Sequence, residues 1–503
     1  MKTQPNTNWP NNNNHTNDTA GFAEFLLRSI RRRTALLATV ATGVLLAAQP
    51  SPSQLPQQIG AVFVIAMENH NLTQPPTQTN PQQILGNPAA PFQNSLITQG
   101  NPNAAQVSYA RAYFNSGTGV HPSEPNYVWA EAGSDFGVHI DADPNPANGN
   151  TFYNQSVHLT KQLNAAGIPW KNYQEDVQFA TSAIHSASGT STTFINPYYG
   201  TGQFNYAVKH NPMAFFADSQ LQNVYPLAQL FDDLNNNAVG RYNWITPNQF
   251  DDSHSALSGG FTYRGTHYTG DQAAVAQGDN FLSIVIPEIM ASQAYQNNGV
   301  IIIWWDETEG GDDTSRTLAE FVISPLAKGN AYASSVVFSH SSDIKTMEEL
   351  FGLPFINNPI PASETNNFGG FNNVAIANDL SDLFVPGTIP SPASTAVTGQ
   401  GFVFNPHTQT YSQVVHIEND GTSPSPEPLW LVLDNLSAGA TLLNPDGTTT
   451  VLAPLGSPYV SVAVGGDGLL RPHEVKTVHL EFLNPSNDPI TYAPRVLDVT
   501  PAL

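Results

Sequence analysis

Two continuous apolar runs constrain the fold of this chain more than any other feature. Residues 61–67 and 300–305 are built of β-branched, aromatic and other apolar side chains, a pattern typical of strands buried on both faces of a parallel sheet. Because ligands in open α/β sheets bind beyond the carboxyl ends of the strands, both run ends should meet at one site. Each run is followed at once by a pair of residues with side-chain oxygen ligands. These residues are Glu68, Asn69, Asp306 and Glu307.

Strand-like and helix-like segments alternate between residues 56 and 385. This alternation predicts a βαβ architecture, with a mainly parallel sheet sandwiched by helices. We therefore expect residues 56–385 to form the catalytic domain. Strands are expected at 61–67, 105–110, 242–246, 300–305 and 320–324, and helices at 156–166, 271–293 and 343–351.

The pattern changes after residue 385. Residues 386–401 are rich in Pro, Ser, Thr, Ala and Gly, which is typical of a linker. Residues 402–503 contain short alternating runs separated by turn signals, so we expect a β-sandwich of immunoglobulin-like type. The sequence of this region contains no catalytic cluster. We therefore expect a spacer or adhesion module, and the sequence does not identify its binding partner.

Residues 1–50 resemble an export signal preceded by a disordered segment. A group of arginines at positions 28–33 precedes the uncharged stretch 34–48, and this order is typical of a signal sequence. The stretch is shorter than the ~20 residues that span a bilayer. We expect an exported protein that is periplasmic, secreted or on the cell surface. A retained membrane anchor is the alternative, and Arg32-Arg33 also permits a twin-arginine export route.

Composition excludes several kinds of chemistry. The chain has no cysteine, so disulfides, thiolate metal sites and cysteine nucleophiles are all excluded. Its formal net charge is −23, which disfavours binding to nucleic acid or to anionic lipid. An anionic substrate would need local positive charge, which a bound cation can supply.

The segment around Ser123 is the candidate nucleophile segment. Ser123 suits a helix N-cap, Pro125 fits the first turn and Gly133 fits the end of the helix. A helix N-terminus favours negative charge, which would stabilise a serine alkoxide and a phosphoryl group attached to it. An ordinary capping serine is the alternative.

Seven short segments, taken together, resemble the phosphoesterase family of the alkaline-phosphatase superfamily. That family includes secreted acid phosphatases and bacterial phospholipases C. The run 70–73, His-Asn-Leu-Thr, differs from the Phe-Asp-His-Tyr type run usual in its phospholipases, which favours the acid-phosphatase branch. The segments occur in the family's order, at 67–69, 121–127, 170–176, 209–212, 246–254, 305–307 and 340–354.

The resemblance implies an alkaline-phosphatase-like fold and assigns roles to particular residues. It implies one or more divalent metal ions, with Ca, Zn, Mg and Fe all open, and Ser123 as nucleophile. The implied metal ligands are Glu68, Asn69, Ser123, Asp306 and Glu307. The implied pocket residues are His254 and His340 as catalytic groups, and Asp252, His121, His210 and Lys209 as substrate contacts. The histidines to which we give structural roles are His70, His139, His158, His185 and His267.

Three functions follow as hypotheses. The first is a secreted, metal-dependent phosphomonoesterase that works through a phosphoserine intermediate. The second is a phospholipase C or another phosphodiesterase, and only a phospholipid substrate would require membrane contact. The third, of another class, is a surface adhesion or binding protein with an inactive phosphatase fold.

Overall fold

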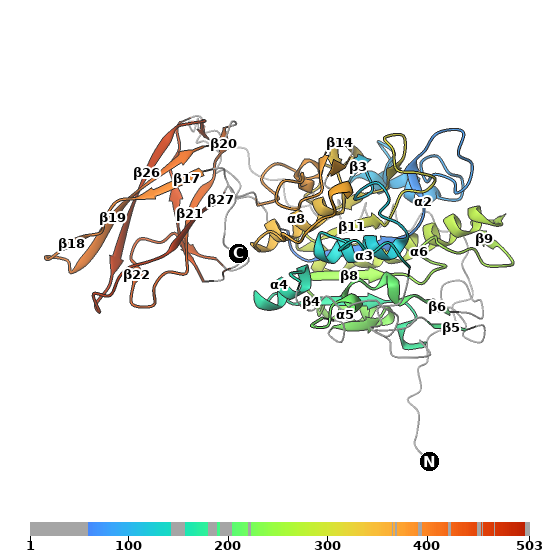
Figure 1. The fold of residues 1–503 in the computed structure, drawn as a ribbon, viewed down its shortest axis with the longest axis horizontal. Coiled ribbons are helices and arrows are strands. Elements are labelled where there is room, and N and C mark those ends of the chain that lie inside the picture. The colour runs from blue at the N-terminus through green and yellow to red at the C-terminus, as the bar shows by residue number, and fades with distance from the viewer. Residues whose placement is uncertain are drawn as a thin grey trace, which may run out of the picture. The chain divides into compact units, whose positions relative to one another are not determined.

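The structure is a computed structural model, and it describes most of the chain after residue 58 (Figure 1). The expected export signal at 1–50 lies outside the described residues, as does His185. Within the described part, no helix is both long and apolar enough to cross a membrane. The described ranges are 59–141, 156–179, 189–191, 204–219, 223–364, 366–367, 370–390, 395–420, 424–449, 454, 456–466 and 468–497.

An eight-stranded mixed sheet forms the centre of the α/β region. Neighbouring strands are parallel except where β13 pairs antiparallel with β11 and with β3, so the sheet is mainly parallel, as predicted. The strands, in spatial order, are β14 (Tyr332–Phe338), β3 (Val107–Tyr113), β13 (Phe321–Ile323), β11 (Val300–Trp305), β1 (Val62–Met67), β8 (Tyr242–Thr246), β4 (Trp170–Gln174) and β7 (Val224–Pro226).

The central strands β1 and β11 are buried along their whole length. Their apolar side chains on both faces explain why the two runs are continuous rather than alternating. All five predicted strands of this region are present, with ends shifted by at most a few residues. Apolar, β-branched runs locate a strand but do not fix its exact ends.

The helices of the α/β region pack in two groups (Figure 1). Helix α3 contacts α4 and α8, whereas α6 contacts α2, α5 and α7. The predicted helix 271–293 ends at Ala291, because the Ser292 side chain accepts a hydrogen bond from Tyr295 N and begins a new helix. The helices are α2 (Pro91–Leu96), α3 (Ser123–Ala132), α4 (Leu159–Ala165), α5 (Ala228–Asn236), α6 (Asp271–Ala291), α7 (Gln293–Gln296) and α8 (His340–Phe351).

Shorter elements complete this region. They are β2 (Asn71–Thr73), β5 (Gly189–Ser191), β6 (Phe204–Tyr206), β9 (Phe261–Tyr263), β10 (Thr266–Tyr268), β12 (Thr317–Leu318), β15 (Asn366–Asn367), β16 (Gly370–Phe371) and the 3-10 helices η1 (Pro102–Ala104), η3 (Val177–Phe179), η4 (Val208–His210), η5 (Pro212–Phe215), η6 (Ala362–Glu364) and η7 (Leu380–Leu383).

The C-terminal region consists of antiparallel strands around a separate apolar core, so the all-β prediction is correct. Its immunoglobulin-like class stays a prediction. The strands are β17 (Thr395–Gly399), β18 (Val403–Asn405), β19 (Thr410–Asn419), β20 (Ser425–Pro426), β21 (Leu429–Asp434), β22 (Thr441–Leu442), β23 (Gly447–Thr448), β24 (Pro458–Val462), β25 (Leu469–Leu470), β26 (Val475–Leu483) and β27 (Ala493–Leu497).

The expected linker at 386–401 requires a correction. Its second half contains β17, which pairs with β19 along five residues, and Ile389 packs in the core of the α/β region. The Thr-Ala-Val-Thr-Gly composition suits an extended strand as well as a linker, and only pairing with β19 distinguishes the two.

Candidate metal centre and nucleophile

The two ligand pairs meet because β1 and β11 are parallel neighbours in register. Their last residues, Met67 and Trp305, are paired, so Glu68 and Asp306 leave the sheet side by side. Asn69 N donates to Asp306 Oδ1 at 3.1 Å, and Asp306 N donates to Met67 O at 3.2 Å. Both carboxylates are fully buried.

Ser123 lies between the two strand ends. Its Oγ is 3.0 Å from Glu68 Oε2 and 3.2 Å from Glu307 Oε1, in hydrogen-bond geometry with both. It is the first residue of α3 and not its N-cap, which is Pro122. The expectation of a capping serine is therefore corrected, because the hydroxyl is turned toward the carboxylates rather than toward the N–H groups of its own helix.

Tyr127 is a site residue that the sequence analysis did not assign. It follows Ser123 by one turn of α3 and so lies on the same helix face. Its hydroxyl donates to Glu68 Oε1 at 2.6 Å, and its ring stacks on His210 at a centroid distance of 4.9 Å. The signal that could have found it was the four-residue spacing from Ser123.

His210 and Asp252 complete a buried cluster with Glu68. His210 Nε2 lies 3.3 Å from Glu68 Oε1, and His210 Nδ1 lies 3.6 Å from Asp252 Oδ2. Neither contact has hydrogen-bond geometry. One ligand atom from each of the three residues lies within 4.8 Å of the others, so the cluster could hold a cation.

The loop after β8 positions this cluster. Asp252 O accepts a hydrogen bond from Glu68 N at 2.8 Å, and Thr246 Oγ1 donates to His210 O at 3.0 Å. Asn248 Nδ2 donates to Asp176 Oδ2 at 2.6 Å, which fixes the loop against the end of β4. The Thr-Pro-Asn segment therefore orients site residues and does not itself contact Ser123.

His254 and His340, the two expected catalytic histidines, lie in different surroundings. His254 is half-buried at the cluster, with its ring 6.0 Å from that of His210. Burial, with the nearby Lys209, lowers the pKa of His254 to about 4. His340 is fully buried, and its Nε2 lies 3.1 Å from Trp305 O while its ring packs on Trp304. The structure therefore places His254, and not His340, beside the other site residues.

His121 joins the centre from the other side. It bridges Glu307 and Asp312, with Nε2 3.0 Å from Asp312 Oδ1. Burial alone would lower the pKa of His121, because it disfavours the charged imidazolium. The hydrogen bonds to Asp312 and Glu307 outweigh this effect and raise the pKa of His121 to about 10. Asp312 also accepts hydrogen bonds from Gly119 N and Thr308 Oγ1.

Lys209 lies near the start of α3 but is paired with Asp141. The other Asp141 carboxylate oxygen accepts a hydrogen bond from Glu124 N at 3.4 Å. Lys209 thus makes no direct contact with Ser123 or the strand-end carboxylates, although its charge helps to stabilise the ionised form of Asp252.

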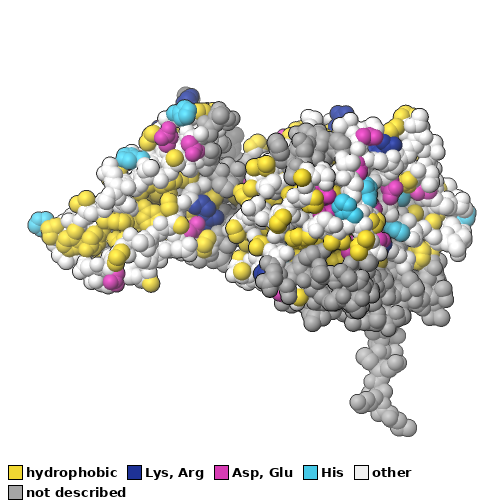
Figure 2. Space-filling model, viewed as in Figure 1, with side chains coloured by type: hydrophobic (Ala, Val, Ile, Leu, Met, Phe, Trp, Pro, Cys, Tyr) yellow, Lys and Arg dark blue, Asp and Glu magenta, His cyan; other side chains and the backbone are white. Residues whose placement is uncertain are grey.

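Figure 2 shows histidine and acidic side chains gathered on one face of the α/β region.

The electrostatics of the centre fit a cation. Burial and repulsion by Asp306 raise the pKa values of Glu68 and Asp252, and burial raises the pKa of Asp306. The pKa of Glu307 is raised to about 7, by burial first. Among the described residues, Asp306 Oδ2 and Asp252 Oδ2 are buried without a hydrogen-bond partner. Buried carboxylates in this arrangement require a counter-charge, and oxygen donors with one imidazole suit a hard or borderline divalent ion.

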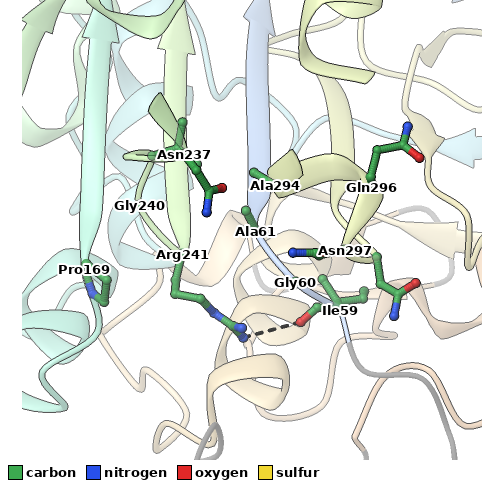
Figure 3. Close-up of a pocket in the computed structure, with 12 residues that line it drawn as sticks. Ile59, Gly60, Ala61, Pro169, Asn237, Gly240, Arg241, Ala294, Gln296 and Asn297 are labelled. Atoms are coloured by element: carbon green, nitrogen blue, oxygen red, sulfur yellow. Dashed lines mark hydrogen bonds between the residues drawn. The ribbon is translucent and has the colours of Figure 1, made fainter. Parts of the chain in front are cut away.

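A cavity of about 580 Å³ opens at the opposite, amino edge of the sheet. Figure 3 shows Arg241 in this cavity, donating to the carbonyl oxygen of Ile59 at 3.4 Å. None of the expected site residues lines it. Its size alone does not make it the active site, because it lacks the carboxylate and serine groups described above.

Comparison with known proteins gives one family and several relatives. The Phosphoesterase family matches residues 90–354. A phosphatidylinositol-3-phosphatase of Mycobacterium tuberculosis is 26% identical over 54% of this chain and 73% of its own length. A phosphate-repressible acid phosphatase of Penicillium chrysogenum is 24% identical over 55% of this chain and 60% of its own length. An acid phosphatase of Aspergillus fumigatus is also 24% identical, over 55% of this chain and 56% of its own length.

Solved structures give weaker similarities. A member of the alkaline phosphatase superfamily from Vibrio parahaemolyticus aligns with a TM-score of 0.39 and 10% identity, over 73% of this chain and 81% of that one. A phosphonate monoester hydrolase from Silicibacter pomeroyi aligns with a TM-score of 0.35 and 11% identity, over 82% and 91%.

Proposed function

Because the chain belongs to the phosphoesterase family and is a hydrolase of phosphoric ester bonds, we propose that it is a metal-dependent phosphomonoesterase with Ser123 as nucleophile. One observation carries this proposal. The Ser123 hydroxyl lies within hydrogen-bond distance of carboxylates from both strand ends. This arrangement is that of a nucleophile held beside its base, as serine-based hydrolysis requires.

The residues that would hold the metal are Glu68, Asn69, Ser123, Asp306 and Glu307, and the cluster of Glu68, His210 and Asp252 would suit a second ion. A divalent cation, when bound, would lower the pKa of the serine hydroxyl and neutralise phosphate oxygens. The buried, unpartnered oxygens of Asp306 and Asp252 support this assignment.

The chain's own residues supply the other steps. Glu68 or Glu307 accepts the Ser123 proton, and Oγ attacks phosphorus in line. The new Oγ–P bond forms as the ester P–O bond breaks, which leaves a phosphoserine at the N-terminus of α3, where the helix dipole favours negative charge. A proton from the protonated ring of His254, a form that its lowered pKa of about 4 confines to acid pH, completes the departing alcohol. Water then attacks the phosphoserine as His254 accepts a proton from it, and the carboxylate returns its proton to Ser123 Oγ as the Oγ–P bond breaks and inorganic phosphate leaves.

Two further parts of the proposal concern substrate and location. The mycobacterial and fungal relatives are both named as phosphatases, which favours a monoesterase over a phospholipase C or another phosphodiesterase. We also propose that the protein is exported, from the signal-like residues 1–50, and that the C-terminal strands form an immunoglobulin-like accessory module. The intact ligand set disfavours an inactive adhesion protein.

Rapid acid quenching tests the covalent step. The wild-type protein, mixed with an aryl phosphate, should show a phosphorylated peptide containing Ser123 by mass spectrometry, and Ser123→Ala should show none. Turnover by Ser123→Ala should fall by a factor on the order of 10³ or more. Ser283→Ala, a half-buried serine on α6, is the matched control and should behave as wild type. Normal turnover by folded Ser123→Ala would refute the nucleophile, and faster hydrolysis of a diester would refute the monoesterase assignment.

A further inference from the structure

A second group of metal-ligand side chains lies at the other end of α3. The helix ends at Gly133 with a φ of 64°, and the chain then places Asp135 and His139 beside Glu364, the last residue of η6. His139 Nε2 lies 2.9 Å from Asp135 Oδ2 and 3.2 Å from Glu364 Oε1. One ligand atom from each residue lies within 4.8 Å of the other two.

The two carboxylates of this group are buried, and one of them is incompletely satisfied. Asp135 is 0% and Glu364 1% exposed, and Glu364 Oε2 has no hydrogen-bond partner among the described residues. A pair of buried carboxyl groups in contact needs either a shared proton or a cation, and the unpartnered oxygen is the observation that points to a missing ligand.

The backbone around these carboxylates is held in place by local contacts. Asp135 Oδ1 accepts a hydrogen bond from Gly137 N at 2.9 Å, and Ser134 Oγ donates to Pro359 O at 2.6 Å. Asn372 Nδ2 donates to Glu364 O at 2.8 Å. Gly117 packs directly on Glu364, since a Cβ added at 117 would come within 2.8 Å of Glu364 Cγ. The ligand groups are therefore positioned before any ion binds.

We propose that Asp135, His139 and Glu364 form a further divalent-cation site, separate from the centre at Ser123 and from the cluster of Glu68, His210 and Asp252. One imidazole nitrogen with two carboxylate oxygens suits a borderline ion such as Zn²⁺ or Mn²⁺ better than Ca²⁺. A tetrahedral Zn²⁺ with bonds of about 2.0–2.2 Å separates its ligand atoms by roughly 3.3–3.6 Å. The two distances from His139 Nε2, 2.9 Å to Asp135 Oδ2 and 3.2 Å to Glu364 Oε1, are shorter than that, so the ligand atoms would move slightly apart around the ion.

The role of this site is structural. The bound ion would tie the segment after α3 to η6, and His139, which is 40% exposed as a side chain, leaves an entry path and room for water ligands. The main chain at Asp135 and at Ser123 is separated by the length of α3, about 15 Å for ten residues. The inference does not depend on the proposed phosphatase mechanism. It makes His139 a metal ligand, whereas the sequence analysis gave this histidine no ligand role.

Zinc stoichiometry of the full chain tests the proposal. Protein is dialysed against chelator, then against Zn²⁺, and its metal content is measured by mass spectrometry. We expect His139→Ala and Glu364→Gln each to bind one equivalent fewer than the wild type, whereas His267→Ala, an exposed histidine in the β9–β10 hairpin, keeps the full content. The same comparison in an Asp306→Asn background separates this site from the centre at Ser123.

Thermal unfolding gives a second readout. Added Zn²⁺ should raise the Tm of the wild type by several degrees, since an ion bound only by the folded state stabilises it, and most of this rise should disappear in Glu364→Gln. If both variants retain the wild-type zinc content and the same Zn²⁺-dependent rise in Tm, the carboxyl groups merely share a proton and the proposal is overturned.

Discussion

Ser123 Oγ lies 3.0 Å from Glu68 Oε2, although the two residues are 55 positions apart in the chain. The contact joins the first residue of α3 to the carboxyl end of β1. The same hydroxyl lies 3.2 Å from Glu307 Oε1, beyond the end of β11. Three elements thus converge on one serine oxygen, and the predictions below test what that convergence does.

Removal of a strand-end ligand should abolish activity together with metal binding. In Asp306→Asn we expect kcat/KM for an aryl phosphate to fall by a factor on the order of 10³ or more, because the amide cannot offset cationic charge. The chelator-treated wild type should lose activity likewise and recover it on addition of one divalent ion. Asp232→Asn, at an exposed position on α5, is the control. Full activity of metal-free protein would contradict the metal requirement.

The two candidate histidines should give different phenotypes. His254→Gln should lower kcat by a factor on the order of 10²–10⁴, with the largest loss for substrates with poor leaving groups, because a proton donor matters most there. His340→Gln should chiefly lower stability, by about 1–3 kcal/mol, since a buried hydrogen bond to Trp305 O is disturbed. Comparison of kcat with urea-unfolding midpoints separates the two effects. Equal kcat losses from both variants would contradict the placement of His340 in the core.

Tyr127 should act as a positioning residue for Glu68. Tyr127→Phe removes the hydroxyl that donates to Glu68 Oε1 at 2.6 Å, and we expect about 10–100-fold weaker metal affinity, as for other groups that orient metal ligands. Excess metal should restore much of the lost kcat. Tyr295→Phe is a matched control, because its buried hydroxyl donates instead to Gln106 Oε1. Unchanged metal affinity in Tyr127→Phe would rule out this role.

A buried acid pair should make the fold more stable at acid pH. Burial raises the pKa of Asp343 to about 7, and burial with the adjacent Asp343 raises that of Glu320; Tyr113 OH donates to Asp343 Oδ2 at 2.5 Å. These groups stay protonated in the folded protein but ionise near pH 4 when unfolded. Their stabilisation is therefore complete below pH ~4 and is lost as pH rises through about 7.

Glu320→Gln tests this pH dependence. In the wild type we expect the free energy of unfolding to be higher at pH 5 than at pH 8 by about 2–4 kcal/mol, measured by urea titration with tryptophan fluorescence. The variant should show a clearly smaller difference, whereas Asp232→Asn should match the wild type. The same pH dependence in all three proteins would mean that the pair does not control it.

The C-terminal strands should be dispensable for chemistry. All proposed site residues lie before residue 390, and Ile389 still packs in the α/β core, so we place the boundary after residue 390 rather than at 385. A truncation after Pro390 should keep kcat for a soluble aryl phosphate within about twofold of the full chain, with matched circular dichroism in the helical region. A soluble, folded truncation without activity would show that the C-terminal region contributes to the site.

Much of this fold could be predicted because its signals are local. The apolar runs of β1 and β11 report burial on both faces, and the ligand pairs follow them directly in the sequence. The linker at 386–401 could not be assigned correctly, because pairing of β17 with β19 is a long-range hydrogen-bonding event. Short strands of Thr, Ala and Val carry no pattern of their own that distinguishes pairing from extended coil.

By itself, the sequence determined that Glu68 and Asp306 directly follow buried strands and that Ser123 lies at the start of a helix. Only the tertiary structure decided which other side chains complete the site. It brought Tyr127 to Glu68 and Asp312 to His121. It also directed His340 into the core, whereas His254 lies beside the other site residues. The physical reason is that strand and helix periodicity is set within a few residues. The direction of a side chain on a loop or helix end, in contrast, is set by packing against segments far away in the chain.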